Sequence, residues 1–132
     1  MNEFLLLSEL KNNTINLAII QSFSLLILNV KNAMILFYIF SNNFINHIIS
    51  NDYDYCDDDF AFYYVNFMKS LSQKIDLNTI QFFFQKDYDF PLLQNALKFY
   101  NYDDPMIKNT VRNLFLTILK RNNKFYSIHK IF

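Results

Sequence analysis

The segment "FPLLQNALKFYNYDDPMIKNTVRNLFLTILK", residues 90–120, holds both prolines of a chain of 132 residues that contains no glycine. A proline is well tolerated at the first position of a helix, because the N–H that it lacks would have no partner there. The residue before a proline avoids helical geometry, so a helix tends to start at the proline itself. We therefore predict helices over 91–101 and 105–121, with Pro91 and Pro105 in their first turns.

Apolar residues in this segment recur at the spacing of one helix face. In the second predicted helix they are Ile107, Val111, Leu114 and Ile118, and in the first they are Leu93, Ala96, Leu97 and Tyr100. The same spacing occurs over 58–74, where the residues are Phe60, Tyr64, Phe67 and Leu71. Asp57 and Asp104 precede two of these stretches, and aspartate is a preferred helix N-cap. Both aspartates are therefore expected to begin helices.

Helical periodicity extends over nearly the whole chain. Further helices are predicted over 2–11, 14–30, 33–41, 43–50 and 77–86. The three long helices then begin about 45 residues apart, which is the repeat length of armadillo and HEAT proteins. Because two shorter helices precede each of the last two long ones, we predict an all-α, armadillo/HEAT-like superhelix of about two and a half repeats. Residues 1–132 would form this single domain, with the long helices stacked in rough parallel.

The final stretch, "KFYSIHKIF" (124–132), is predicted to open another repeat after a helix end at Asn122 and Asn123. In a chain without glycine, asparagine best tolerates the left-handed geometry of a helix end. Repeats bury their apolar faces on their neighbours, and this segment is too short to cover its own apolar residues. These are Phe125, Ile128, Ile131 and Phe132. We expect the isolated chain to associate with itself through this end or to require a longer chain.

Composition limits the class of protein. Hydrophobic residues make up 52% of the chain, which favours a packed core over disorder. The formal net charge is zero, and no nucleic-acid partner is expected, because such binding depends on clustered lysine and arginine. Polar residues interrupt the apolar stretch 15–40, so it is interpreted as buried helices rather than as a membrane span. The wealth of Asn, Ile, Phe and Tyr is typical of an A/T-rich genome, such as some protists have.

No pattern in the sequence indicates catalysis or a cofactor. The acidic stretch "DYDYCDDDF" (52–60) lacks the glycine and the glutamate of a calcium-binding loop, and we interpret it as a solvated loop that caps a helix. His47 and His129 have no partners at the spacing of zinc ligands. The single cysteine, Cys56, excludes an intramolecular disulfide, fits a reducing compartment and has no base beside it. We therefore expect no metal, no cofactor and no enzyme activity.

Three blocks of the chain resemble one known family. They are "LFYIFSNNFINHII" (36–49), "YYVNFMKSLSQKIDLNTIQFFF" (63–84) and the opening segment, 90–120. On these blocks the chain resembles the FPL-domain family, which is the N-terminal region of Ema and of proteins like C-type lectin domain family sixteen member A.

The signature tripeptide of that family is present as Phe90, Pro91 and Leu92. The later motif "MIKNTVR" also matches, with Lys108 where arginine is usual and with Arg112 in place. The resemblance implies that these five residues carry the signature and are candidates for partner binding. Arg112 lies off the predicted core line of its helix, so its side chain is either solvated or in contact with a partner or a neighbouring repeat.

The resemblance further implies a role in endosome-to-lysosome traffic, autophagy and mitophagy, with Rab-type GTPases and ubiquitin-ligase machinery as partners. We therefore expect a non-enzymatic protein-interaction scaffold. It would be cytoplasmic, with peripheral association with endosomal, lysosomal or Golgi membranes. Family members continue for many hundreds of residues, so this chain is expected to be truncated relative to them. The alternative is a truncated or degenerate structural fragment of a longer helical-repeat protein, with no independent activity.

Overall fold

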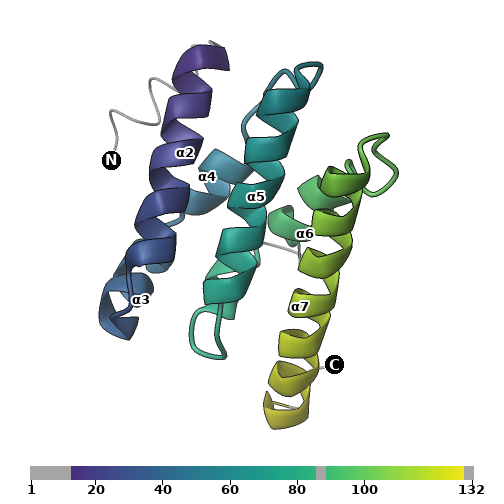
Figure 1. Cartoon of the computed structure of the whole chain (residues 1–132). Helices are drawn as coiled ribbons and strands as arrows, with labels where there is room; N and C mark the ends of the chain where they lie inside the picture. Colours follow the sequence, from purple (N-terminus) through teal and green to yellow (C-terminus); the bar gives the residue numbers. More distant parts are fainter. Residues whose placement is uncertain (1–12, 86–88, 130–132) are drawn as a thin grey trace.

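The computed structural model describes residues 13–85 and 89–129, with side chains up to Lys120. All regular structure in these residues is helical (Figure 1). The elements are α2 (Asn13–Asn29), α3 (Ala33–Ser41), α4 (Phe44–Ser50), α5 (Asp58–Lys74), the 3₁₀ helix η1 (Ile80–Phe83), α6 (Pro91–Leu97) and α7 (Pro105–His129). The helix predicted over 2–11 lies outside the described residues.

Both prolines begin helices, as predicted. Pro91 is the first residue of α6 and Pro105 is the first residue of α7. Phe90, just before α6, has φ −127° and ψ 85°, outside the helical region as a residue before proline requires. Asp104 caps α7, because its carboxylate accepts a hydrogen bond of 2.8 Å from the Met106 N–H. Local chemistry therefore fixes both helix starts.

The end of α6 differs from the prediction, because the helix stops at Leu97 instead of residue 101. Beyond it, the N–H groups of Phe99 and Tyr100 donate to the carbonyls of Ala96 and Leu97, three residues back. This tighter turn buries the ring of Phe99, which is 2% exposed. Tertiary packing thus overrides the predicted stripe, and Leu97 and Tyr100 are exposed rather than in the core.

The predicted end of α7 near residue 121 was also wrong. The helix continues to His129, so 124–132 does not begin a separate helix within the described residues. Asn122 and Asn123 are only mildly unfavourable inside a helix, and no glycine or proline follows them. The expected exposed side chains of this end lie outside the residues whose side chains are described; they are Phe125, Ile128, Ile131 and Phe132.

The helix predicted over 77–86 is reduced to η1. The carboxylate of Asp76 accepts hydrogen bonds of 2.8 Å and 2.9 Å from the N–H groups of Asn78 and Thr79. An aspartate that holds the backbone in this way favours a turn over continued α-helix. The short 3₁₀ helix that follows places Ile80 and Phe83 in the core, each 1% exposed.

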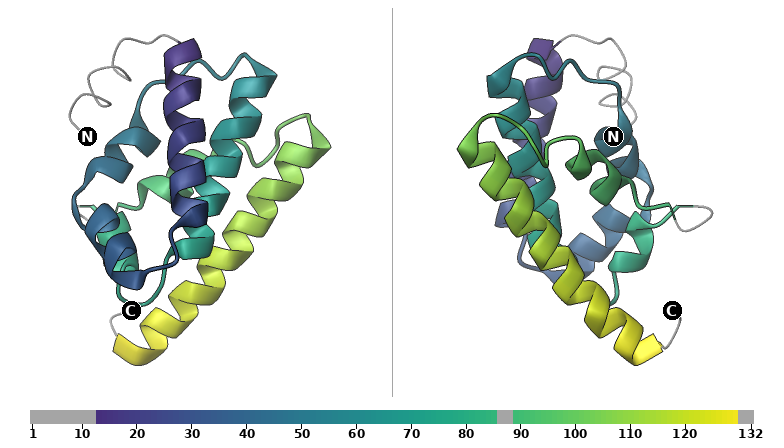
Figure 2. Two further views of the ribbon diagram at one scale, coloured as in Figure 1. Left: turned by 60° about the vertical axis from the view of Figure 1, so that its left-hand side comes forward. Right: turned by 90° about the vertical axis from the view of Figure 1, so that its right-hand side faces the viewer.

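The three long helices α2, α5 and α7 lie side by side and run in the same general direction, with α5 in the middle (Figure 1). The expected rough parallel stacking is therefore confirmed. The shorter elements α3, α4, η1 and α6 form a second group of helices on one side of this layer (Figure 2). The long helices thus leave one face of their layer without cover from the short helices.

The core is centred on α5, which packs against both other long helices. The predicted stripe residues of α5 and of α7 are all 1% exposed or less; they are Phe60, Tyr64, Phe67, Leu71, Ile107, Val111, Leu114 and Ile118. The sequence pattern for these two helices is therefore confirmed. The aromatic runs of the sequence contribute mainly to this core, as expected for a chain so rich in phenylalanine.

Buried hydrogen bonds of Tyr64 and Tyr53 attach α5, and the segment that precedes it, to the end of α4. The Tyr64 hydroxyl donates to the carbonyl of Ile49, and the Tyr53 hydroxyl donates to the carbonyl of Ile48 at 2.7 Å. Both carbonyls lie in the last turn of α4, where they have no partner within the helix. Burial raises the pKa of Tyr64 well above its ordinary value, so the phenol keeps its proton and remains a donor.

Candidate functional site

The FPL tripeptide lies in the core. Phe90 is 6% exposed and stacks on the ring of Phe84, with 4.6 Å between the ring centroids. Pro91 is buried at the start of α6, and the side chain of Leu92 has no exposed surface. These three signature residues therefore shape the start of α6 and its packing, and their side chains are not available at the surface.

Lys108 and Arg112 lie on α7, one turn apart. Lys108 is half-buried, whereas Arg112 is exposed. The guanidinium carbon of Arg112 lies 5.9 Å from the centroid of the Tyr100 ring, a cation–π contact between α7 and the turn after α6. Tyr100 in turn meets the ring of Phe115 edge-on, with 6.0 Å between the centroids.

An apolar groove opens at this contact. We call it the α6–α7 groove; its volume is about 480 Å³ and it is lined by Leu97, Tyr100, Arg112, Phe115, Leu116 and Leu119. Leu97 is 58% exposed and Leu116 is 65% exposed, so the apolar lining is open to solvent. Arg112 is the charged member of this lining, and it adds a positive group with planar, directional donors.

Of the five residues predicted for the site, only Arg112 lines the groove. The apolar residues of the groove were not predicted, because the helical spacing assigned Leu97 to the core and gave Leu116 and Leu119 no role. One signal was present: Phe115, Leu116 and Leu119 are apolar although they lie off the predicted core line of α7. A second apolar stripe on one helix indicates a second surface to be covered.

The acidic loop before α5 behaves as a helix cap. The carboxylate of Asp57 accepts a hydrogen bond of 3.0 Å from the N–H of Asp59, and Asp58 and Asp59 occupy the first turn of α5. Negative charge there is favourable, because the N-terminal end of a helix is the positive end of its dipole. Among the described residues, no group of three or more His, Cys, Asp or Glu side chains is arranged to hold a metal ion.

Cys56 lies in this loop and is exposed. Asp54 raises the pKa of the Cys56 thiol above its ordinary value, through a hydrogen bond between the side chains and through charge repulsion. A raised pKa means that the thiolate forms only at higher pH, and the thiolate is the nucleophile.

We predict that Cys56 reacts slowly with a disulfide reagent at neutral pH despite its exposure. Replacing Asp54 with asparagine should make the reaction several-fold faster and move its pH profile to lower pH, because the repelling charge is gone. Stopped-flow rates from pH 6 to pH 10 on the folded variants measure this. Superimposable profiles for the two proteins would contradict the role of Asp54.

No single helix in the described part of the chain is both long and apolar enough to cross a membrane. One bent pair, α3 with α4, passes that test by length and composition only, with an angle of 63° between its helices. Several residues of this pair belong to the core, including Phe40, Phe44 and Ile48.

Comparison with known proteins supports the resemblance. The family model named FPL, described as an uncharacterised conserved protein, matches residues 1–119. The CLEC16A homolog of Caenorhabditis elegans is 37% identical over 118 residues, which are 89% of this chain and 13% of that protein. Human CLEC16A is 34% identical over 103 residues, 77% of this chain and 10% of that protein.

A plant protein is similar as well. TRANSPARENT TESTA 9 of Arabidopsis thaliana is 29% identical over 123 residues, 89% of this chain and 15% of that protein. The chain thus spans between 10% and 15% of the length of these three relatives. No solved structure matches it. Because the family model covers most of the chain, this protein, which is helical throughout its described regular structure, belongs to the FPL family.

Proposed function

We propose that this chain is a non-enzymatic protein-interaction scaffold that acts in endosomal maturation and autophagy, including mitophagy. The family resemblance suggests the cellular role, and the α6–α7 groove supports the mode of action. The scaffold is cytoplasmic and reaches endosomal, lysosomal or Golgi membranes as a peripheral protein. Its partners are proteins, with Rab-type GTPases and ubiquitin-ligase machinery as the classes that the family resemblance suggests.

The scaffold is built, in our proposal, from armadillo/HEAT-like repeats. The order of elements supports this, because short helices α3 and α4 precede the long α5, and η1 and α6 precede the long α7. The long helices lie side by side in one layer, so each repeat would contact only its neighbours (Figure 1). A superhelix of this kind presents an extended surface, which suits a protein that holds partners rather than one that transforms substrates.

The α6–α7 groove carries the proposal. Monomeric proteins rarely leave a contiguous apolar surface open unless it is a place of contact. The lining offers aliphatic and aromatic side chains together with one arginine, and arginine and tyrosine are typical anchors of protein interfaces. The matching partner is an amphipathic helix that lays its apolar face in the groove and places one carboxylate against Arg112.

The non-enzymatic part of the proposal rests on Cys56, the most obvious nucleophile. A ligase that transfers ubiquitin through a cysteine needs an activated thiolate. Here the pKa of the Cys56 thiol is raised by Asp54, which disfavours the thiolate. This exposed cysteine therefore suits a surface position rather than a catalytic one.

Capture of a Rab-type GTPase or of a ubiquitin-ligase subunit by the immobilised chain tests the proposal. We expect Leu116→Asp to reduce capture by at least about tenfold, because it puts a charge into the apolar groove. Arg112→Ala should reduce capture less, by about threefold to tenfold, because it removes one charged anchor. Quantitative mass spectrometry of the bound fraction, with circular dichroism of each variant, gives the measurement.

A matched control is available on α2. Leu25 is 61% exposed, close to the 65% of Leu116, and it lies outside the groove. Leu25→Asp should therefore leave capture unchanged. If both leucine variants lose capture equally, the groove is not the binding surface. If the folded chain captures no member of either class, the alternative of a structural fragment without independent activity is favoured.

A further inference from the structure

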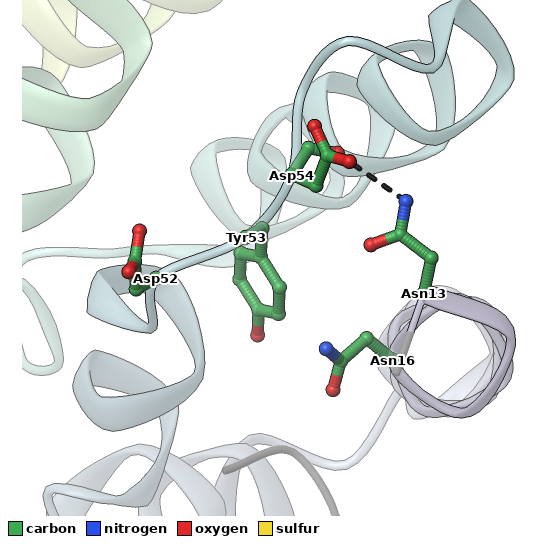
Figure 3. Close-up of a pocket in the computed structure, with 5 residues that line it drawn as sticks. All are labelled: Asn13, Asn16, Asp52, Tyr53 and Asp54. Atoms are coloured by element: carbon green, nitrogen blue, oxygen red, sulfur yellow. Dashed lines mark hydrogen bonds between the residues drawn. The ribbon is translucent and has the colours of Figure 1, made fainter. Parts of the chain in front are cut away.

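A second, polar pocket lies between the start of α2 and the segment that joins α4 to α5 (Figure 3). Its volume is about 180 Å³, and it is lined by Asn13, Asn16, Asp52, Tyr53 and Asp54. Asn13 and Asn16 come from one face of α2 and point toward residues 52–54 (Figure 3). The Nδ2 atom of Asn13 donates to the backbone carbonyl of Asp54 at 3.5 Å, which holds one wall against the other.

Asn16 is the unusual member of this lining. Its side chain is 1% exposed, yet neither its Nδ2 nor its Oδ1 atom has a hydrogen-bond partner. Buried amides are almost always paired, because burial without a partner is costly. Asn16 therefore holds a donor and an acceptor side by side, ready for a group that enters the pocket (Figure 3).

The complement of a carboxamide is a group that also has an acceptor and a donor side by side. A guanidinium or an ammonium offers donors only, and a carboxylate offers acceptors only. In an extended chain the N–H and the C=O of one residue point to the same side, so together they can pair with the Oδ1 atom and one Nδ2 hydrogen of Asn16. The pocket is also large enough, because its volume exceeds that of several water molecules.

The charged residues around the polar pocket indicate which charge its ligand should carry. Asp52 and Asp54 line the pocket, Asp57 follows in the same loop, and Asp58 and Asp59 follow in the first turn of α5. Between Lys31 and Lys69 the sequence has no lysine or arginine. The wall formed by the loop is therefore acidic, and it favours a segment with basic side chains.

We infer that this pocket binds an extended basic peptide segment of a partner protein. The N–H and the C=O of one residue of the segment pair with the Asn16 carboxamide, and a neighbouring lysine or arginine side chain lies against Asp54. The pocket is separate from the α6–α7 groove in lining and in ligand chemistry. Failure of this inference would therefore leave the groove proposal standing, and the reverse also holds.

Titration with short peptides tests the inference on the full chain. The probe is an acetylated and amidated hexapeptide of alternating alanine and lysine, and the comparison is the same peptide with glutamate in place of lysine. We expect the lysine peptide to bind, more weakly at high salt, and the glutamate peptide not to bind. Asn16→Leu and Asp54→Asn should each weaken binding by about tenfold. Isothermal titration calorimetry and amide chemical shifts give the measurement.

Denaturant unfolding distinguishes a binding role of Asn16 from a structural role. Asn16 has no partner to lose, so Asn16→Leu should unfold at the same denaturant concentration as the parent chain or at a higher one. The matched control is Asn95, which is 8% exposed and donates to the carbonyl of Pro91 at 2.8 Å. Asn95→Leu should lower the unfolding midpoint and leave peptide affinity unchanged.

Three results would overturn the inference. The first is equal affinity for the lysine and glutamate peptides. The second is unchanged affinity in Asn16→Leu, which would show that the amide contacts only solvent. The third is no binding of the lysine peptide at low salt.

Discussion

Leu92→Ala is expected to lower the free energy of unfolding by about 3 kcal/mol, the largest loss among the substitutions that we predict. The Leu92 side chain has no exposed surface, so truncation leaves a cavity as well as lost apolar burial. Urea denaturation followed by circular dichroism measures the change. If the parent chain is itself stable by less than this amount, the variant will be unfolded already in buffer.

The same helix supplies the control. Leu97 closes α6 and is 58% exposed. Leu97→Ala makes the same chemical change in the same helix, and its cost should stay within about 0.5 kcal/mol. The difference between the two variants isolates burial from helix propensity. Equal effects at both positions would show that Leu92 is not a core residue. The signature tripeptide would then be a candidate for surface contacts.

Tyr64→Phe is expected to cost about 2 kcal/mol, because it removes one atom and leaves a buried carbonyl without a partner. The Tyr64 hydroxyl donates to the carbonyl of Ile49 at the end of α4, and the Tyr64 ring is fully buried. Phenylalanine keeps the ring and its packing, so the loss reports the hydrogen bond alone. Thermal and urea unfolding of both proteins give the difference.

Tyr102 provides the control for the Tyr64→Phe substitution. Its hydroxyl donates to the carboxylate of Asp58, and this hydrogen bond raises the pKa of Tyr102 to about 12. The bond is exposed to water, which replaces it at little cost. Tyr102→Phe should therefore change stability by less than about 0.5 kcal/mol. A Tyr64→Phe variant as stable as Tyr102→Phe would mean that the Ile49 carbonyl finds another partner.

Local chemistry was readable from the sequence. Pro91 and Pro105 fix their own backbone geometry, and Asp57 and Asp104 satisfy N–H groups two residues away. Such effects act within one helical turn and need no knowledge of the rest of the chain. The core stripes of α5 and α7 were also predictable, because an apolar residue at every third or fourth position must face a common interior. The resemblance to the FPL family rested on the blocks 36–49, 63–84 and 90–120, and the last two contain most of these core stripes.

The end of α6 and the α6–α7 groove were not predicted, because both depend on distant segments that meet in the fold. α6 ends at Leu97 because Phe99 turns into the core beside Tyr64, with 5.7 Å between the ring centroids. That contact joins residues far apart in sequence, so local helix propensity does not predict it. The α6–α7 groove follows from this turn, since it leaves Leu97 and Tyr100 exposed next to Arg112.

The polar pocket also depends partly on features readable from the sequence and partly on the tertiary structure. The sequence places Asn16 in the helix predicted over 14–30, with Asn13 just before it, and it makes the segment 52–54 acidic. Only the fold brings that segment against α2 and buries the Asn16 carboxamide without a partner. The sequence by itself determined the helical class of the described residues and the starts of α5, α6 and α7, because these depend on backbone chemistry and periodicity, and its motifs indicated the family. The tertiary structure decided which side chains line a groove or a pocket, because burial is a property of pairs of surfaces that meet.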